Sequence, residues 1–273
     1  MKETTITEIN YVREPWIKEE EAWSTRSDFF FNLHERADRK EQMVRFINFL
    51  KEHNLLPAAG SKTLDIGCGV GDYALALAKA GMDAYGIDLA EGMIQGAAKL
   101  ATKENTPLTL FVGPWSESTR NDLDWTKSFD LTYSVFCPVM LDKENLLAMT
   151  KTSKGKCLLL AFAERKDTVV DYLHEHIPSK QRYADEETLG NLIDYVRTIG
   201  VNVEEHYQTA EETEAIELEK AIEYFSLRVM TDFDGTKEEL HIKLKELLQP
   251  FTKDGKVHNP TKDRILWLSW EPK

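Results

Sequence analysis

Three glycines at alternate positions, Gly67, Gly69 and Gly71, separate a short apolar segment from an alanine-rich one. Residues 63–66 have the composition of a buried strand, and residues 72–80 have that of a helix. Glycines in such a turn let a ligand approach the backbone, and the helix N-terminus offers unpaired N–H groups. The segment therefore predicts a strand, turn and helix of a parallel sheet, with a ligand bound where the strand ends.

Short apolar segments alternate with helical ones over most of the remaining chain. Strands are predicted at residues 84–87, 108–112, 130–135, 157–162, 201–207 and 265–270, and helices at residues 91–103, 143–152 and 187–199. This alternation is typical of βαβ units, in which helices cover both faces of a parallel sheet. The predicted fold class is therefore α/β.

Two segments lie outside this pattern. Residues 1–60 are rich in aromatic side chains and are predicted to form an N-terminal helical cap, with one long helix from about Ser27 to His53. Residues 209–251 are predicted to form a helical insertion before the last strand, where they could act as a lid. We therefore expect a cap at residues 1–60 and one domain at residues 61–273 that contains the insertion.

The acidic residues around the glycine turn indicate which ligand it binds. A dinucleotide turn of the form G-x-G-x-x-G needs glycine at position 72, where this chain has Asp72, so an NAD-dependent oxidoreductase is disfavoured. Asp65 precedes the first glycine by two positions and suits a positively charged amino group better than a pyrophosphate. Asp88 ends the next predicted strand, where its carboxylate can accept hydrogen bonds from both ribose hydroxyls. Together the two aspartates predict a site for a nucleoside that carries an amino group.

Asp65, the glycine turn and Asp88 resemble motif I and the acidic loop of the class I S-adenosylmethionine (SAM)-dependent methyltransferases. The resemblance extends over about residues 61–162. It implies a Rossmann-like sheet of seven strands in the order 3-2-1-4-5-7-6, with strand 7 antiparallel and helices on both faces. It also implies SAM as the cofactor and S-adenosylhomocysteine (SAH) as the product.

The resemblance assigns roles in cofactor binding to ten residues. Asp65 would hold the SAM amino group, Asp88 the ribose, and the backbone of Gly67, Cys68 and Gly69 the methionine portion. Leu89 and Met93 would pack on the adenine. The acidic residue that usually follows the third strand is missing, so Trp115 and Ser116 are the expected adenine neighbours, with Glu117 as the nearest acid. Ser134 opens the loop after the fourth strand, which is expected to face the methyl group.

The acceptor side of the site is less defined by the sequence. The loop Ser134 to Pro138 lacks the Asn/Asp-Pro-Pro-aromatic motif of enzymes that methylate amino groups of nucleobases or amides. Expected substrate-binding residues are Tyr11, Trp23, Arg26 and Phe136. If the acceptor needs a general base, His34 and Asp28 are the candidates, together with His174 or His176. Cys137 could be a nucleophile, but methyl transfer from a sulfonium needs none, so a packing role is favoured.

The composition of the chain indicates which binding partners, metal sites and compartment to expect. The formal net charge of −13, without a basic stripe, disfavours nucleic acid as a partner. The three cysteines, Cys68, Cys137 and Cys157, form no C-x-x-C pair, so we expect neither a disulfide nor a metal site. The N-terminus lacks the features of a signal peptide, and no apolar run is long enough to span a membrane, so we expect a cytoplasmic protein. We expect a monomer or a homodimer.

The leading hypothesis is a methyltransferase that acts on a small molecule. A protein methyltransferase is the first alternative and would need an open groove in place of a closed aromatic pocket. A SAM- or nucleoside-binding module without catalysis is the second alternative.

Overall fold

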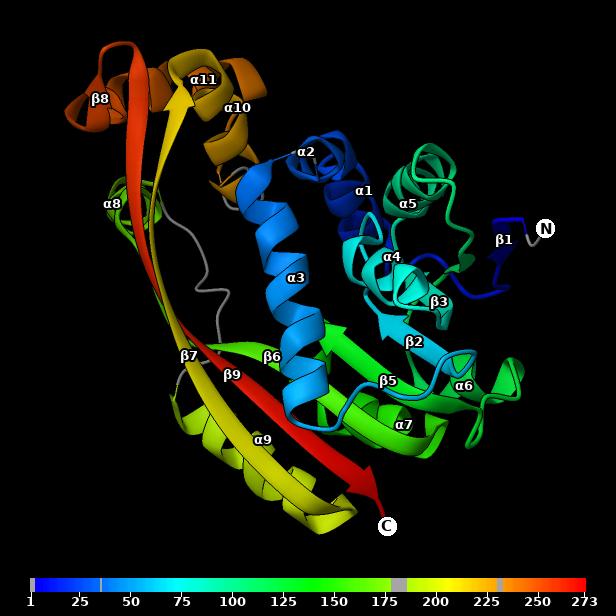
Figure 1. Cartoon of the computed structure of the whole chain (residues 1–273). Helices are drawn as coiled ribbons and strands as arrows, with labels where there is room; N and C mark the ends of the chain where they lie inside the picture. The colour runs from blue at the N-terminus through cyan, green and yellow to red at the C-terminus, as the bar shows by residue number, and fades with distance from the viewer. Residues whose placement is uncertain (1–2, 35, 178–185, 230–232) are drawn as a thin grey trace. The chain divides into compact units, whose positions relative to one another are not determined.

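A computed structural model describes residues 3–34, 36–177, 186–229 and 233–273 of the chain (Figure 1). Its single sheet has nine strands, with β8 paired to β9 at one side and the others in the order β1-β4-β3-β2-β5-β6-β9-β7. The strands are β1 (Thr5–Glu8), β2 (Lys62–Ile66), β3 (Asp83–Asp88), β4 (Thr109–Val112), β5 (Phe129–Val135), β6 (Ser153–Asp167), β7 (Gly200–Glu217), β8 (Thr252–Lys253) and β9 (Lys256–Pro272). Without β1 and β8, this is the order 3-2-1-4-5-7-6, so the predicted fold is confirmed.

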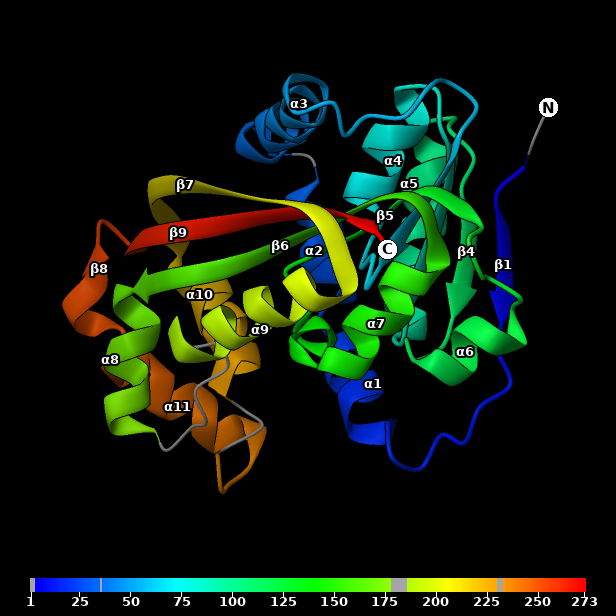
Figure 2. The ribbon, with the colours of Figure 1, turned by 90° about the horizontal axis from the view of Figure 1, so that it is seen from below.

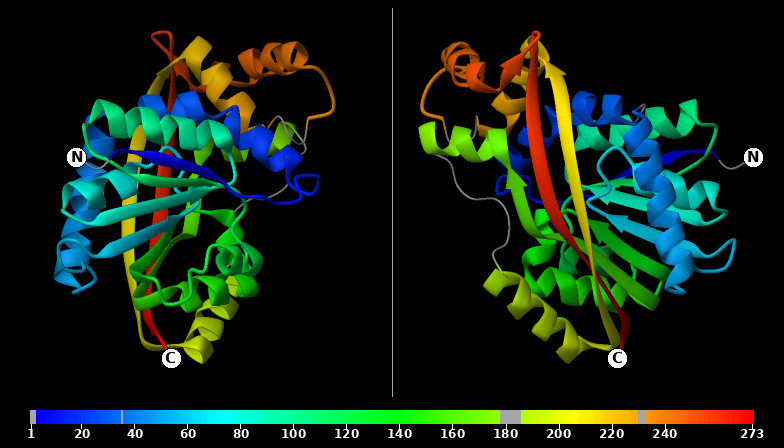
Figure 3. Two further views of the ribbon diagram at one scale, coloured as in Figure 1. Left: turned by 90° about the vertical axis from the view of Figure 1, so that its right-hand side faces the viewer. Right: turned by 60° about the vertical axis from the view of Figure 1, so that its left-hand side comes forward.

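The chain divides into two compact units. Unit 1 comprises residues 1–161, 188–206 and 267–273, and unit 2 comprises residues 162–187 and 207–266. The strands β6, β9 and β7 contribute residues to both units, and β7 and β9 run side by side in Figure 3. All residues predicted to bind the cofactor belong to unit 1, and the candidate histidines His174 and His176 belong to unit 2.

The helices of unit 1 lie on the two faces of its sheet, with α3, α4 and α5 on one face and α6, α7 and α9 on the other (Figure 2). These helices are α1 (Ile17–Ser24), α2 (Ser27–Leu33), α3 (Ala37–Glu52), α4 (Asp72–Lys79), α5 (Glu91–Lys103), α6 (Glu117–Asp122), α7 (Lys143–Thr152) and α9 (Glu186–Ile199). The short 3₁₀ helix η1 (Pro138–Leu141) precedes α7. Phe46 of α3 packs on Tyr73 of α4 at 4.9 Å and on Tyr133 of β5 at 5.8 Å between ring centroids. This aromatic layer joins the helices to the strands that carry the glycine turn.

Unit 2 contains α8 (Thr168–His176), α10 (Leu218–Val229), α11 (Lys237–Leu247), the 3₁₀ helix η3 (Gln249–Phe251) and β8. A partly buried ion network links its strands, because Arg165 of β6 lies 3.2 Å from Asp263 of β9 and 3.7 Å from Asp167. The Asn259 side chain accepts a hydrogen bond from the backbone N–H of Val169, the second residue of α8. No described helix of the whole chain is both long and apolar enough to cross a bilayer.

The structure corrects three sequence predictions. Residues 1–60 are not entirely helical, because Thr5–Glu8 form the edge strand β1, which pairs in parallel with β4. The helix expected from Ser27 to His53 is two helices, α2 and α3, since Arg36 has an extended backbone with φ −69° and ψ 141°. Residues 209–217 are a continuation of β7 and not part of a helical insertion. Residues 230–232 of the predicted helical insertion lie outside the described residues.

Candidate functional site

The glycine turn joins β2 to α4 through three residues with left-handed backbone angles. The φ angles are 72° at Gly67, 54° at Gly69 and 82° at Gly71, a region that favours glycine. A Cβ atom on Gly67 would lie 2.8 Å from the Cys137 Cβ and would overlap its sulfur, whereas a Cβ on Gly69 would meet no atom within 4 Å. The turn therefore packs closely against the loop after β5 at Gly67 and leaves open space at Gly69.

Asp88 connects the glycine turn to the start of α5. One carboxylate oxygen accepts a hydrogen bond from the Gly69 N–H at 2.8 Å, and the other accepts one from the Ala90 N–H at 2.9 Å. Burial raises the pKa of Asp88, although these two bonds oppose the shift. The residue is half-buried, so part of it remains accessible to a ligand.

Asp65 lies on β2 opposite Tyr133 of β5 in the parallel register. Its side chain is only 1% exposed, and neither carboxylate oxygen makes a hydrogen bond of ordinary geometry in the described part of the chain. Burial raises the pKa of Asp65 well above its usual value and the negative charge of Asp88 raises it further, although the nearby Tyr133 hydroxyl opposes this rise. A buried carboxylate in this position gains from a neighbouring cation, because the cation would compensate the charge that burial penalises.

The N-terminal helices pack on an apolar cluster at the glycine turn. Val70, Ala90 and Met93 form the buried part of this cluster, and the partly buried side chains that cover it are Trp23, Phe30 and Phe31. The Ser24 hydroxyl accepts a hydrogen bond from the Gly92 N–H at 3.2 Å, which fixes the end of α1 to α5. The buried Arg26 guanidinium lies 4.8 Å above the Trp23 ring. The structure thus brings Trp23 and Arg26 to the same cluster as Met93.

His34 belongs to a buried polar network at the start of α4. Its Nδ1 lies 2.6 Å from one Asp72 carboxylate oxygen, and Arg39 donates to the other from Nε at 2.9 Å. Burial alone would raise the pKa of Asp72, but the hydrogen bond from His34 and the charge of Arg39 outweigh it and lower the pKa. His34 is therefore engaged in attaching the N-terminal helices to α4. Arg39 was missed by the sequence analysis, because its partner is 33 residues away.

Ser134 near the end of β5 and Cys137 in the following loop lie at the two sides of the step from β2 into the glycine turn, with Phe136 between them in the sequence. The buried Ser134 hydroxyl donates to the Ile66 carbonyl at 2.7 Å, and Phe136 has a positive φ of 53°. Burial raises the pKa of the Cys137 thiol to about 12, so it is protonated near neutral pH. This disfavours Cys137 as a nucleophile and agrees with a packing role against Gly67.

The other candidate residues have different surroundings. Trp115 is buried, and its indole N–H donates to the Asn145 carbonyl at 3.1 Å. The Ser116 hydroxyl caps α6 by accepting from the Thr119 N–H at 3.1 Å. Tyr11 donates to Glu20 at 3.5 Å. Leu89 is half-buried beside Asp88, and Asp28 is exposed to solvent. The side chains of Trp115, Ser116 and Tyr11 therefore each form a hydrogen bond within the protein.

Residues 63–154, which include the glycine turn and Asp88, match the model of the methyltransferase domain family. A 59-residue segment is 46% identical to the ubiquinone biosynthesis O-methyltransferase of Methylococcus capsulatus and covers 22% of this chain and 24% of that protein. A 49-residue segment is 47% identical to the SAM-dependent Diels-Alderase iccD of Talaromyces variabilis and covers 18% of this chain and 17% of that protein. The matched segments thus span no more than about a quarter of these two curated relatives.

A solved structure with a similar fold is the magnesium protoporphyrin IX methyltransferase of Synechocystis with bound SAH. It superposes with a TM-score of 0.51 over 93% of this chain and 99% of that chain, at 14% identity. At this identity the likeness shows that the two chains share a fold.

Proposed function

We propose that this chain, which has the class I fold of SAM-dependent methyltransferases and a methyltransferase domain at residues 63–154, transfers a methyl group from SAM to a small-molecule acceptor. The observation that carries the proposal is the pair of acidic side chains on the two sides of the glycine turn. Among the described residues none makes a hydrogen bond of ordinary geometry to the buried Asp65 carboxylate, and Asp88 holds the turn while the residue stays partly accessible.

The residues of the turn fit the cofactor. The Asp65 carboxylate would receive the SAM ammonium group, which supplies the positive charge that this buried side chain lacks. Asp88 would accept hydrogen bonds from the ribose hydroxyls through the lone pairs that Gly69 and Ala90 leave free. The open space beside Gly69 would admit the methionine portion. Leu89 and Met93 would provide apolar contacts for the adenine.

Bound SAM supplies an activated methyl group on a sulfonium. The protein's part is to hold the acceptor in line with that group and to exclude water. Trp23, Phe30 and Phe31 would shield the site, since they already pack on the cluster at the turn. Aromatic faces also favour a nearby cation by about 0.5 to 2 kcal/mol. Because Cys137 is protonated and His34 is hydrogen-bonded to Asp72, positioning is the main contribution we assign to the described residues.

A small-molecule acceptor is supported by two observations. The two methyltransferases described above are named for ubiquinone biosynthesis and for magnesium protoporphyrin IX, which are small molecules. The net charge of −13 also disfavours a polyanion as acceptor. Transfer to a protein side chain remains the alternative within the same chemistry.

A second candidate function follows from the segment that is 47% identical to a SAM-dependent Diels-Alderase. A Diels–Alder cycloaddition joins two π systems and transfers no group. In that case the described residues would bind SAM in the same way, but no SAH would form.

Calorimetric titration with SAM, SAH and NAD, followed by an SAH-release assay on pools of small acceptors, tests both functions. We expect micromolar binding of SAM and SAH, no binding of NAD, and SAH release with one acceptor class. SAM binding with conversion of a substrate but without SAH release would favour the second candidate. Absence of SAM binding would contradict both.

A further inference from the structure

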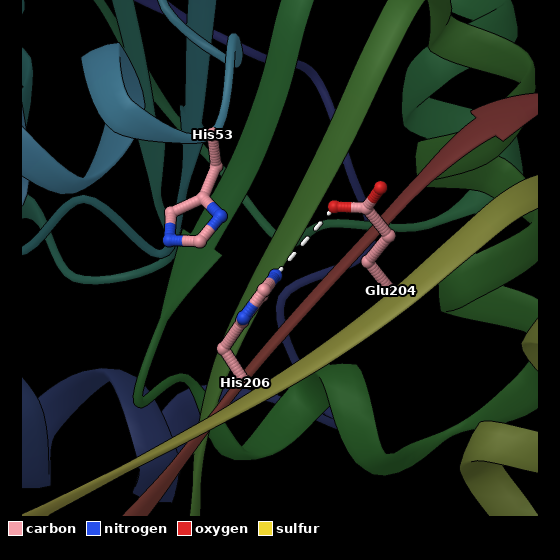
Figure 4. Close-up of side chains that lie close together, drawn as sticks. All are labelled: His53, Glu204 and His206. Atoms are coloured by element: carbon pink, nitrogen blue, oxygen red, sulfur yellow. Dashed lines mark ion pairs between the residues drawn. The ribbon is translucent and has the colours of Figure 1, made fainter.

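Two histidines and a glutamate of unit 1 converge at the C-terminal end of α3 (Figure 4). His53 follows α3 directly, and Glu204 and His206 are two positions apart on β7. Alternate residues of a strand lie on the same face, so both side chains point to the same side of β7. One ligand atom from each residue lies within 4.8 Å of the other two.

The contact between His206 and Glu204 has the geometry of two metal ligands. The His206 Nε2 and a Glu204 carboxylate oxygen form an ion pair at 3.5 Å, drawn as a dashed line in Figure 4. Nε2 is shielded from solvent and has no hydrogen-bond partner in the described part of the chain. Zinc binds imidazole nitrogen and carboxylate oxygen at about 2.0 to 2.2 Å in tetrahedral geometry, which separates two ligands by about 3.4 Å. The observed separation matches that value.

The surrounding aromatic rings hold the two imidazoles in place. The His53 ring lies 4.0 Å from the His206 ring and 4.2 Å from Phe49, measured between centroids. Phe49 in turn stacks on Trp267 of β9 at 4.0 Å. The backbone is fixed as well, because the His53 N–H donates to the Phe49 carbonyl at 3.0 Å. Ligands that are already positioned lose little entropy when an ion binds.

The end of α3 is also attached to β6. The Lys156 ammonium donates to the carbonyl of Asn54, the residue after His53, at 2.9 Å. This bond restrains the chain on the far side of His53, so the imidazole is anchored from both directions.

We propose that His53, Glu204 and His206 bind one divalent transition-metal ion of the zinc class. Two neutral imidazoles and one carboxylate suit zinc, nickel or copper better than magnesium or calcium, which prefer oxygen ligands only. Three protein ligands leave a fourth position for water. The sequence prediction of no metal site weighed only the cysteines, because the spacing between residue 53 and residues 204 and 206 gives no recognisable motif.

The proposal does not depend on the methyltransferase function. A bound ion would join α3 to β7, which are more than 140 residues apart in the chain, and would stabilise the folded state by mass action. Its effect is therefore measurable as metal affinity and as thermal stability, without any substrate.

The test uses untagged, chelator-treated protein and zinc chloride in competition with a chromogenic chelator. We expect one zinc ion per chain with micromolar or tighter affinity, a rise in Tm with zinc, and visible absorption bands when cobalt replaces zinc. His53→Gln and His206→Gln should each weaken zinc affinity at least tenfold and remove the Tm rise. His176→Gln, which changes an exposed histidine on α8, is the matched control and should leave both unchanged.

Absence of zinc binding to the wild-type protein would overturn the proposal, as would an affinity that His53→Gln and His206→Gln leave unchanged. Circular dichroism and the thermal unfolding transition of each metal-free variant show whether it has folded. Should one variant fail to fold, Glu204→Gln provides the second measurement, because this exposed side chain can lose its charge with little effect on packing. It should weaken zinc binding several-fold, and an unchanged affinity would contradict the assignment.

Discussion

At the scale of single residues, burying the Asp65 carboxylate costs folding free energy, and a bound cationic ligand best explains why the protein carries it. Burial and the charge of Asp88 raise its pKa, so between the usual carboxyl pKa and the raised value the folded protein binds more protons than the unfolded chain. The free energy of unfolding of the ligand-free protein therefore falls as pH rises through that window. Above the window it stays lower by a constant amount. A positively charged ligand would remove the penalty.

Asp65→Asn should consequently raise the Tm of the ligand-free protein and weaken SAM binding. In a chain of this length each kcal/mol shifts Tm by about 2 to 4 °C, so we expect a rise of a few degrees. In the wild-type protein SAM affinity should increase with pH, by at most about tenfold per pH unit, until Asp65 has lost its proton. Scanning fluorimetry and titrations at several pH values check this. A lower Tm, or a pH dependence that the variant retains in full, would contradict the role of Asp65.

Alanine substitutions at Gly67 and Gly69 provide a controlled test of how the turn packs. Both have positive φ, but only a Cβ at position 67 would collide with Cys137. Gly69→Ala should cost about 1 to 2 kcal/mol in unfolding free energy, which is the usual cost of a left-handed alanine. Gly67→Ala should cost more by at least about 1 kcal/mol, because it adds a steric clash. Urea denaturation of both variants measures the difference, and equal costs would show that the turn does not pack on Cys137 as described.

At the scale of elements, the helices α1 and α2 are attached to the glycine turn by the aromatic side chains on Val70, Ala90 and Met93. Trp23→Ala should lower the unfolding free energy by about 1 to 3 kcal/mol, since Trp23 is only partly buried, and should also weaken SAM binding. Trp16→Ala changes a half-buried tryptophan before α1 and is the control, for which we expect a smaller effect on SAM. Denaturation and calorimetry test both, and equal SAM affinities for the two variants would contradict a shielding role of Trp23.

The positions of the central strands were predictable because each contains a short apolar run, and their order was implied by the resemblance of the glycine turn and Asp88 to the class I methyltransferases. The strand β1 was not predictable from the sequence, because Thr5, Thr7 and Glu8 are polar and exposed. This strand is held by its backbone pairing with β4. Residues 209–217 have a helix-favouring composition, but in the fold they continue a long strand. Partnerships such as His34 with Asp72 depend on tertiary packing, for which the sequence contains no spacing signal.

At the scale of the whole molecule, the residues assigned to the cofactor all lie in unit 1, whereas the segment expected to act as a lid, residues 209–251, lies in unit 2. The lid role of residues 209–251 remains a prediction. The division into a cap at residues 1–60 and a separate domain also remains a prediction. The described residues of the expected cap belong to the same compact unit as the central strands.

The acidic balance of the chain gives a prediction at this scale. With a net charge of −13, the protein should not bind labelled single-stranded RNA or DNA, even at low salt and tens of micromolar protein. Fluorescence anisotropy checks this, with a basic nucleic-acid-binding protein as positive control. Salt-sensitive binding would indicate a local basic surface and would reopen the question of the acceptor.

The central claim is that Asp88 and the glycine turn bind SAM, and the most direct measurement is calorimetric titration of SAM into the wild-type protein, Asp88→Ala and the exposed-site control Asp122→Ala. The account predicts micromolar affinity for the wild type and the control. For Asp88→Ala it predicts a loss of about 1.5 to 3 kcal/mol, roughly ten- to 150-fold, because hydrogen bonds to a charged acceptor disappear. Equal affinity of Asp88→Ala and the wild type would contradict it.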